Sequence, residues 1–353
     1  MTVPLSVLDL ASVYEGMSNA DALAHTIDTA RVADAEGFRR FWVAEHHGMD
    51  AVSSSAPAVL MSAIASATPR IRVGSGGVML PNHSSLVIAE QFGTLVALFG
   101  DRIDLGIGRA PGTDGLTARV LRRNIQNETE NDFPQQVLEL LAFFGITAPL
   151  ANGLGSTITA VPGLGDAPAM WLLGSSGYSA QLAGMLGLPF VFAHHFAGTD
   201  QTPQVFDLYR ASFREGGVLE APYAMVSVAT LVGADSADAE RLALPNNLWT
   251  LRLFRGGRPG RVPTQAAAEA YDWTSTDRAF AETRNASQAV GDLDRVTARV
   301  DELCGATGAD EVLLVPQGGS TDVKLATLRA LGPVARAATA RESVGSAAGA
   351  GRA

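Results

Sequence analysis

The sequence predicts an α/β fold, a (β/α)8 TIM barrel with insertions after the fourth and seventh strands. Short apolar runs alternate with amphipathic segments along most of the chain. Such alternation without long polar linkers indicates right-handed crossovers and a parallel sheet. Eight strand–helix units can be counted in the 353 residues, and a barrel of this type takes about 250 residues plus insertions. Hydrophobic residues make up 47% of the chain, which favours a large buried core over disorder.

Each expected strand is a run of apolar, often β-branched residues bounded by polar residues or glycine. The strands are expected at residues 5–10, 38–44, 71–80, 102–107, 169–173, 188–193, 225–232 and 311–316. End signals mark helices between them: Asn19 and Asp21 can cap the first helix, Gly37 ends it, and Pro69 ends the second. The helices are expected at residues 19–36, 55–68, 84–99, 178–186, 202–215, 292–305 and 321–331, with another beginning at residue 236.

Two stretches depart from this alternation. Residues 113–168 contain helical patterns at 116–127 and 135–144, and residues 157–161 can form a short strand. Residues 244–273 carry several glycines and prolines. We expect an irregular segment there, either a lid over a pocket or a solvated surface insertion.

Composition narrows the class of protein. We expect one barrel domain over residues 1–334 and a disordered tail of small and polar residues over 335–353. The net charge of −10 disfavours a nucleic-acid partner. Cys304 is the single cysteine, so no disulfide forms within the chain. With no signal-peptide pattern and no apolar run of membrane-spanning length, a cytoplasmic location without membrane contact is expected.

The predicted strand ends carry unusual residues, and barrel enzymes place their chemistry at the C-terminal ends of strands. Five successive strands end in histidine, glycine, arginine or serine. These ends are Glu45-His46-His47, Gly76-Gly77, Gly108-Arg109, Gly174-Ser175-Ser176-Gly177 and His194-His195. An arginine that follows glycine at a strand end can cradle a phosphate, because guanidinium matches phosphate oxygens. Taken alone, Gly108-Arg109 equally fits a tight turn with a surface arginine.

Together these motifs resemble the bacterial luciferase-like, flavin-dependent monooxygenases, and the resemblance covers nearly the whole chain. The segments that carry it are Glu45-His46-His47, residues 73–83, Ala89-Glu90-Gln91-Phe92, and residues 100–109, 173–189 and 311–314. The resemblance implies a two-component enzyme. A separate flavin reductase would supply reduced FMN (FMNH2), which would react with O2 to oxygenate a small organic substrate. It also implies a homodimer, and the small and apolar residues at 56–67 suit close packing of helices.

The resemblance assigns the flavin phosphate to Arg109, Ser176 and Ser179. The physics agrees, because Ser175, Ser176 and Gly177 precede a predicted helix, whose N-terminus attracts anions. An ordinary helix cap would explain Ser176 without a phosphate. Ser175, Gly177 and Gly108 complete the expected cofactor-binding set.

The resemblance also places Gly76 and Gly77 beneath the isoalloxazine ring, joined by a non-proline cis peptide. Two glycines let backbone approach a flat ring closely, although a β-bulge is the simpler explanation.

His46 matches the family's active-site histidine, and imidazole with a pKa near 6.5 can move a proton near neutral pH. Glu45 is expected to orient neighbouring groups. A metal site is the alternative for this motif, but His46 and the adjacent His47 point to opposite sides of an extended chain. We therefore predict no metal. His83, His194 and His195 are expected either to line the substrate pocket or to be structural.

Two departures argue against light emission. Luciferases proper have a cysteine where Gly108 stands and a carboxylate where Ser175 stands. Three functions stay open: an FMNH2-dependent monooxygenase, a deazaflavin-dependent dehydrogenase of the same superfamily, and a non-catalytic flavin-binding protein. The arginine- and alanine-rich composition suggests a GC-rich genome, where tailoring of secondary metabolites is one role for such an enzyme. The sequence does not name the substrate or the type of oxygenation.

Overall fold

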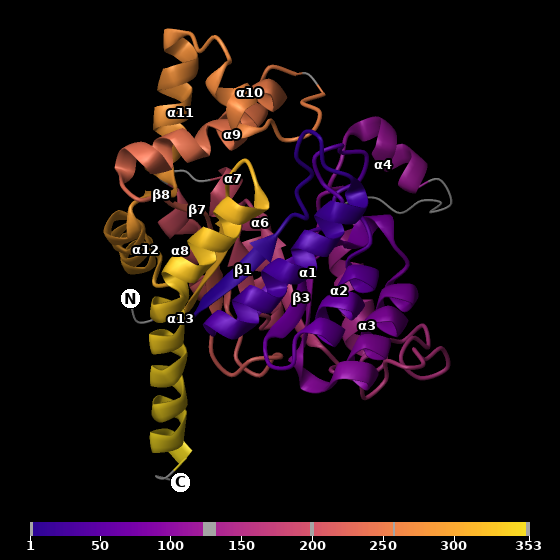
Figure 1. The fold of residues 1–353 in the computed structure, drawn as a ribbon. Coiled ribbons are helices and arrows are strands. Elements are labelled where there is room, and N and C mark those ends of the chain that lie inside the picture. Colours follow the sequence, from indigo (N-terminus) through magenta and orange to yellow (C-terminus); the bar gives the residue numbers. More distant parts are fainter. Residues whose placement is uncertain (1–2, 123–131, 198–200, 257, 351–353) are drawn as a thin grey trace.

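The computed structural model describes residues 3–122, 132–197, 201–256 and 258–350. Within these residues, eight parallel strands close into a barrel surrounded by helices (Figure 1). The barrel strands are β1 (Leu5–Asp9), β2 (Arg40–Val43), β3 (Arg72–Met79), β4 (Ile103–Gly108), β5 (Ala169–Gly174), β6 (Phe190–Phe192), β7 (Ala224–Val232) and β9 (Glu311–Pro316). The barrel closes because β7 pairs with β6 and β9, and β9 pairs with β1. The predicted barrel is confirmed.

Helices follow the strands in the order expected of right-handed crossovers. Those of the barrel are α1 (Asn19–Glu36), α2 (Pro57–Ala67), α3 (Ser85–Phe99), α6 (Gly177–Leu186), α8 (Thr202–Ser212), α12 (Leu293–Thr307) and α13 (Thr321–Ala350). Short elements in the connections are η1 (Leu80–Asn82), η2 (Gly100–Arg102) and α7 (His194–Ala197). The insertion after β4 contains α4 (Gly115–Leu121) and α5 (Phe133–Phe143). The insertion after β7 contains α9 (Ser236–Phe254), α10 (Gln265–Glu269), α11 (Ser275–Ser287) and a ninth strand, β8 (Ala289–Gly291).

The ends of α1 show how local sequence sets an element. Ser18, not the predicted Asn19, is the N-cap: its hydroxyl accepts a hydrogen bond from Asp21 N, and the Asp21 side chain accepts one from Ser18 N. This capping box satisfies two amides that the helix cannot, and such a cap contributes about 1 kcal/mol. Gly37 ends the helix with a φ of 81°, as predicted.

The N-terminal end of the barrel is filled by a network of paired charges. Arg40 contacts Asp104 at 2.8 Å and Glu311 at 3.0 Å, and both carboxylates are fully buried. Arg72 holds the other Asp104 oxygen at 2.7 Å, and Trp42 Nε1 donates to Asp104 at 2.9 Å. Further donors to Glu311 are the hydroxyls of Ser6 and Tyr223. These bonds tie β1, β2, β3, β4 and β9 together near the start of each strand.

The insertion after β7 differs from the prediction. Residues 244–254 are not irregular, because α9 continues through Pro245 to Phe254. Past the proline, Leu248 and Leu251 pack with Ala268 and Trp273 in an apolar cluster separate from the barrel core, and this packing compensates for the break that proline causes. In Figure 1, α9, α10 and α11 stand together above the barrel. The short strand β8 was not predicted, because three residues carry too little pattern.

Two expectations for the insertion between β4 and β5 also differ from the structure. No strand forms at residues 157–161, where the structure has only an isolated bridge between Leu154 and Ile158. The helix predicted at 116–127 ends at Leu121, and the part of that prediction over residues 123–127 lies outside the described residues.

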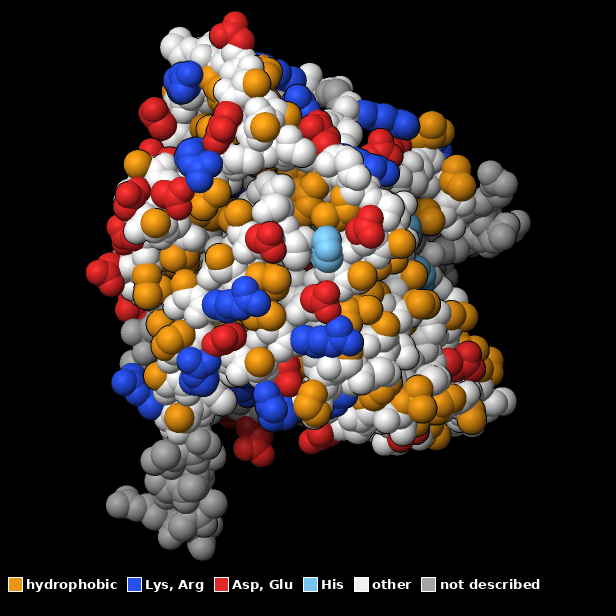
Figure 2. Space-filling view, in the orientation of Figure 1, with side chains coloured by type: hydrophobic (Ala, Val, Ile, Leu, Met, Phe, Trp, Pro, Cys, Tyr) orange, Lys and Arg blue, Asp and Glu red, His pale blue; other side chains and the backbone are white. Residues whose placement is uncertain are grey.

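Helix α13 crosses the predicted boundary at residue 334, packs against α1, and continues to Ala350 beyond the body of the barrel (Figure 1). Ala335 and Ala338 are buried, so these residues belong to the packed barrel and not to the predicted tail. On the face shown in Figure 2, acidic and basic side chains are mixed among apolar ones and form no continuous basic patch. Among the described helices, none is long and apolar enough to cross a bilayer.

Candidate active site at the C-terminal ends of the strands

The barrel brings the predicted strand ends to one mouth. Strands β2, β3, β4, β5 and β6 are neighbours in the sheet, and all are parallel. Their C-terminal residues therefore face the same end of the barrel. Met79 lies opposite Gly108, and Gly174 lies opposite Phe192.

Glu45, just after β2, is a fully buried carboxylate that ties the ends of β2 and β3 together. Its Oε1 accepts hydrogen bonds from His47 Nε2 at 2.8 Å and His83 Nε2 at 2.7 Å, and its Oε2 accepts one from Met79 N at 3.2 Å. Burial acts to raise the pKa of Glu45, but these hydrogen bonds outweigh it and lower the pKa to about 2. Glu45 is thus a permanent acceptor that can orient the loops around it.

The same three groups have the composition of a metal site. One ligand atom from each of Glu45, His47 and His83 lies within 4.8 Å of the others. From the sequence, a metal site was weighed only for Glu45, His46 and His47, and the place of His83 in this group was not predicted. In the structure the Nε2 atoms of His47 and His83 each bond directly to the Glu45 carboxylate. The three side chains thus supply hydrogen-bond partners to one another.

His46 is in a different state from its neighbour. Its backbone N donates to Ser54 O at 3.0 Å. Its Nδ1 is buried and has no hydrogen-bond partner among the described residues. Burial lowers the pKa of His46 below its usual 6.5, and His47 adds to this effect while Glu45 opposes it. The imidazole is therefore mostly neutral at pH 7.

His46 borders a cavity of about 590 Å³, large enough for a small organic molecule. The walls come from α1, the loop after β2, α4 and the segment after α9. The lining residues are Asn19, Leu23, His46, Gly48, Met49, Asp50, Val52, Ser53, Ser55, Thr117, Arg258 and Arg261. The segment after α9 is held in place, because Val262 N donates to Val13 O at 3.0 Å and Arg261 Nη1 donates to Met17 O at 2.6 Å. Only this part of the predicted lid segment lines the cavity.

Gly76 and Gly77 are joined by a cis peptide bond, as the resemblance implied. The pairing of β3 with β4 also shifts between Ser75 and Val78, which is the bulge that the simpler explanation required. A Cβ on Gly76 would lie 2.7 Å from Leu8 Cδ1, and one on Gly77 would lie 2.8 Å from Gly106 O. Barrel packing alone therefore demands glycine at position 77, where a Cβ would meet backbone, whereas at position 76 the end of the Leu8 side chain would have to move.

Arg109 and the first turn of α6 form a cradle for an anion. The Arg109 guanidinium lies 4.3 Å from the ring centroid of Tyr178, the second residue of α6, and within the described chain it pairs with no carboxylate. Ser176 is the N-cap of α6, but its hydroxyl makes no capping bond. The free amides of this helix end and the nearby cation favour an anion. Ser179 is buried against Gly174, beneath the exposed Ser175 and Ser176.

The two histidines after β6 have different roles. His194 is buried, with Nε2 3.2 Å from Ser287 O and Nδ1 2.9 Å from the Thr202 hydroxyl. Both nitrogens bond to the framework, which is the structural role, one of the two alternatives given for His194. His195 Nδ1 lies 2.6 Å from Ser227 Oγ, which itself donates to Phe192 O. His195 must therefore donate from Nδ1, and its Nε2 is left as an acceptor.

The pKa of His195 is shifted strongly by its surroundings. Burial lowers the pKa of His195 to about 3, and Arg284 and His46 add to this shift. Three residues of the mouth were not predicted from the sequence. They are Arg284 on α11, Ser227 on β7 and Tyr178 on α6. Only Tyr178 had a signal, its position directly after the Gly177 that opens a helix. Nothing in the local sequence distinguishes Arg284 from other arginines on amphipathic helices.

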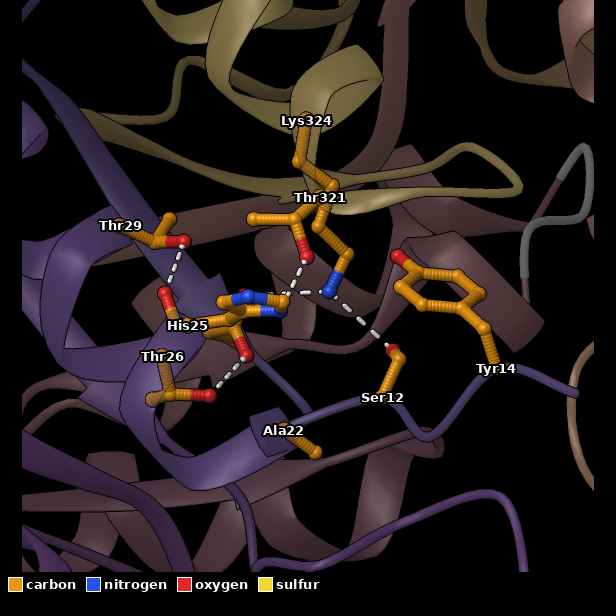
Figure 3. A pocket seen from close by; sticks show the side chains of 9 residues that line it. Ser12, Tyr14, Ala22, His25, Thr26, Thr29, Thr321 and Lys324 are labelled. Atoms are coloured by element: carbon orange, nitrogen blue, oxygen red, sulfur yellow. Dashed lines mark hydrogen bonds and ion pairs between the residues drawn. The ribbon is translucent and has the colours of Figure 1, made fainter. Parts of the chain in front are cut away.

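A second polar cluster lies at the end of β1 (Figure 3). The single lysine, Lys324, contacts Asp9 Oδ2 and Ser12 Oγ at 3.2 Å each, beside the ring of Tyr14. The cavity there is about 10 Å³, room for about one water molecule. Burial acts to lower the pKa of Lys324, but Asp9 and Tyr14 outweigh it and raise the pKa. A charged, enclosed ammonium suits an ion pair and is a poor nucleophile.

Comparison with known proteins agrees with this geometry. The sequence model of the family described as luciferase-like monooxygenase matches residues 4–311. A protein of Escherichia coli strain K12 named luciferase-like monooxygenase is 42% identical over 313 residues, 89% of this chain and 91% of that protein. The N-acetyl-S-alkylcysteine monooxygenase of Bacillus subtilis strain 168 is 34% identical over 273 residues, 76% of this chain and 79% of that protein.

Solved structures share the fold. The crystal structure of apo-MsnO8 superposes with a TM-score of 0.82 at 34% identity, covering 94% of this chain and 98% of that one. The oxygenating constituent of 3,6-diketocamphane monooxygenase from Pseudomonas putida, solved in complex with FMN, has a TM-score of 0.68 at 20% identity, covering 94% and 97% of the two chains. The strand-end motifs, the barrel and these matches together show that the chain belongs to the luciferase-like monooxygenase family.

Proposed function

We propose that this protein is the oxygenating component of a two-component system that uses reduced FMN and O2 to oxygenate a small organic substrate. The observation that carries the proposal is the pairing of Arg109 with the uncapped start of α6, at the same barrel mouth as the unsatisfied nitrogen of His46. An anion cradle at the same end of the barrel as a cavity bordered by one free imidazole suits a phosphorylated cofactor and a separate substrate. The FMN complex of the Pseudomonas putida protein supports the choice of cofactor.

The residues present fit FMN. Arg109, the hydroxyls of Ser175 and Ser176, and the first amides of α6 would hold the phosphate, while Ser179 supports the helix turn from below. The backbone of β3 and β4 carries no side chains at Gly76, Gly77 and Gly108, and the resemblance places the flat ring there. When bound, the reduced flavin supplies the electrons that activate O2.

The protein's own groups would position and protect the reaction. His46, mostly neutral at pH 7, lines the cavity and can donate or accept one proton. Glu45 holds His47, His83 and the end of β3, so the loop that carries His46 keeps its place. The pinned segment around Val262 closes one side of the cavity and limits the access of water.

Partners follow from the same proposal. No glycine-rich dinucleotide motif opens a helix, so a separate reductase would reduce the flavin. A homodimer is proposed through α2 and α3, where Val59 is 73% exposed and Leu98 is 65% exposed. Light scattering at micromolar concentration should give twice the 36.7 kDa of one chain. We also propose a cytoplasmic enzyme that tailors secondary metabolites.

Oxygen consumption tests the proposed reaction. Reduced FMN, delivered by a generic reductase, should be oxidised with incorporation of one oxygen atom from ¹⁸O₂ into a product found by mass spectrometry of a substrate library. With a reduced deazaflavin in place of reduced FMN, neither oxidation of the cofactor nor incorporation of ¹⁸O should be seen. Hydride transfer with the deazaflavin and no oxygen incorporation would favour the dehydrogenase alternative, a chemistry seen in an F420-dependent secondary alcohol dehydrogenase that shares the fold. No turnover with either cofactor would favour a flavin-binding protein.

A further inference from the structure

Arg284 is a half-buried arginine to which the described part of the chain offers no carboxylate. It lies in the last turns of α11. Its one hydrogen bond within that part runs from Nε to Thr250 Oγ1 on α9, at a long 3.4 Å. Most donors of a planar guanidinium, which has five, are thus left without protein partners.

The contrast with Arg40 shows how unusual this is. Arg40 is also removed from water, but Asp104 and Glu311 neutralise it, and their charges raise its pKa despite burial. At Arg284 burial acts alone and lowers the pKa to about 10. The side chain still carries a full charge at pH 7. The half-buried guanidinium therefore keeps donors that no protein group fills, and this indicates an anion that comes from outside the chain.

The position of Arg284 relates this anion to the reaction. Arg284 and His46 both lower the pKa of His195, which follows β6 at the mouth. The C-terminal end of α11 is fixed there, because Ser287 O bonds to His194 and Gln288 Oε1 accepts from Ala229 N at 2.9 Å. The guanidinium is therefore held by packed elements and not by a free loop.

We propose that Arg284 binds a carboxylate of the substrate and that the substrate class is a small organic acid. The inference rests on the proposed function, since the acid would be the molecule that the flavin-dependent reaction oxygenates. A carboxylate fits because two parallel N–H···O bonds match the guanidinium fork. Arg109 follows β4, whereas α11 belongs to the insertion after β7, three strands further around the barrel. One FMN phosphate on Arg109 therefore leaves Arg284 for a second anion.

Matched pairs of probes test the proposal without any turnover. Hexanoate and hexanamide, and N-acetyl-S-ethylcysteine and its primary amide, would be titrated calorimetrically into the protein at constant ionic strength. At least one acid should bind about 10- to 100-fold more tightly than its amide, the range of a charge-assisted hydrogen bond. Arg284→Met should reduce this preference to within about threefold, and Arg284→Lys should keep part of it. Arg278→Met, which removes an exposed charge from the same helix, is the matched control and should keep the full preference.

A second readout guards against a folding artefact. Arg284→Met should have a Tm equal to or above that of the wild type, because it removes an unpaired charge, and the acid probe should raise the Tm of the wild type only. Equal binding of acid and amide in the wild type for both pairs, or an unchanged preference in Arg284→Met, would overturn the proposal. Weakened binding of reduced FMN in Arg284→Met would also overturn it, by assigning Arg284 to the cofactor. A protein that fails to bind reduced FMN but keeps the acid preference would instead count against the proposed function.

Discussion

The two ends of the barrel handle charge in opposite ways. At the N-terminal end, Arg40 and Arg72 are matched by Asp104 and Glu311, with hydroxyl and indole donors filling the remaining acceptor positions. At the C-terminal end, Arg109 and Arg284 have no carboxylate partner among the described residues, and His46 Nδ1 has no hydrogen bond there. At the first end the buried charges have partners within the protein without any ligand. The second becomes complete only when something binds, which is the physical signature of a site.

This difference determines what a substitution should do. Removing one member of the paired network leaves a buried charge uncompensated and should damage the fold. Removing an unpaired group at the mouth should leave stability unchanged or improved while binding or chemistry is lost. The predictions below separate the two ends by measuring stability and function in the same variants.

The largest effect is expected for His46→Ala. Product formation should fall by about 10²–10⁴, the usual contribution of a positioned acid or base. Affinity for reduced FMN should stay within a few-fold, because the phosphate groups lie elsewhere. Oxygen uptake should continue and release hydrogen peroxide in place of product. Peroxide and product would be measured at equal oxygen uptake, and an unchanged ratio would remove His46 from the mechanism.

At the opposite end, Asp104→Asn should lower the free energy of unfolding by about 3–5 kcal/mol, because Arg40 and Arg72 lose a shared buried counter-charge. Urea unfolding followed by circular dichroism would measure it. Asp101→Asn, an exposed carboxylate near the start of the same strand, is the control and should change stability by less than about 0.5 kcal/mol. A loss as small as that of the control would mean that the network contributes little.

Arg109→Ala should weaken FMN by about ten- to a hundredfold and riboflavin hardly at all, since riboflavin lacks the phosphate. Fluorescence titration of both flavins into each protein gives the comparison. Arg122→Ala is not a neutral control, because Arg122 donates to Asn82 near the same loop. Exposed Arg119 on α4 is the better choice. Equal losses for FMN and riboflavin would move Arg109 away from the phosphate.

The smallest effect concerns pH. The pKa of folded His195 is about 3, against about 6.5 when unfolded, so the unfolded chain binds more protons between these values. The stability that comes from His195 is therefore complete above pH 6.5 and is lost as the pH falls toward 3. His195→Gln should flatten the decline in unfolding free energy between pH 6.5 and 4.5. If the curves of unfolding free energy against pH were parallel for the variant and the wild type, burial would not lower the pKa of His195.

Most site residues that lie at the ends of barrel strands could be predicted from the sequence. Few of the site residues that lie on the insertions could be. Arg109 and the start of α6 were expected to meet because β4 and β5 are neighbours in any such barrel. Arg284 could not be predicted, since its place depends on the packing of α11 against α9 and on contacts with residues distant in sequence. The pairing of Glu45 with His83 was missed for the same reason, because the two are 38 residues apart on different loops. The path of α9 through Pro245 depended on an apolar cluster that no local rule shows.

An anaerobic titration tests the central claim most directly. The protein would be titrated with reduced FMN and, separately, with oxidised FMN. The account predicts saturable binding of one FMN per chain, tighter for the reduced form, and a purified protein that is nearly colourless. A yellow protein that holds oxidised FMN tightly and is reduced directly by NADH would contradict the two-component assignment.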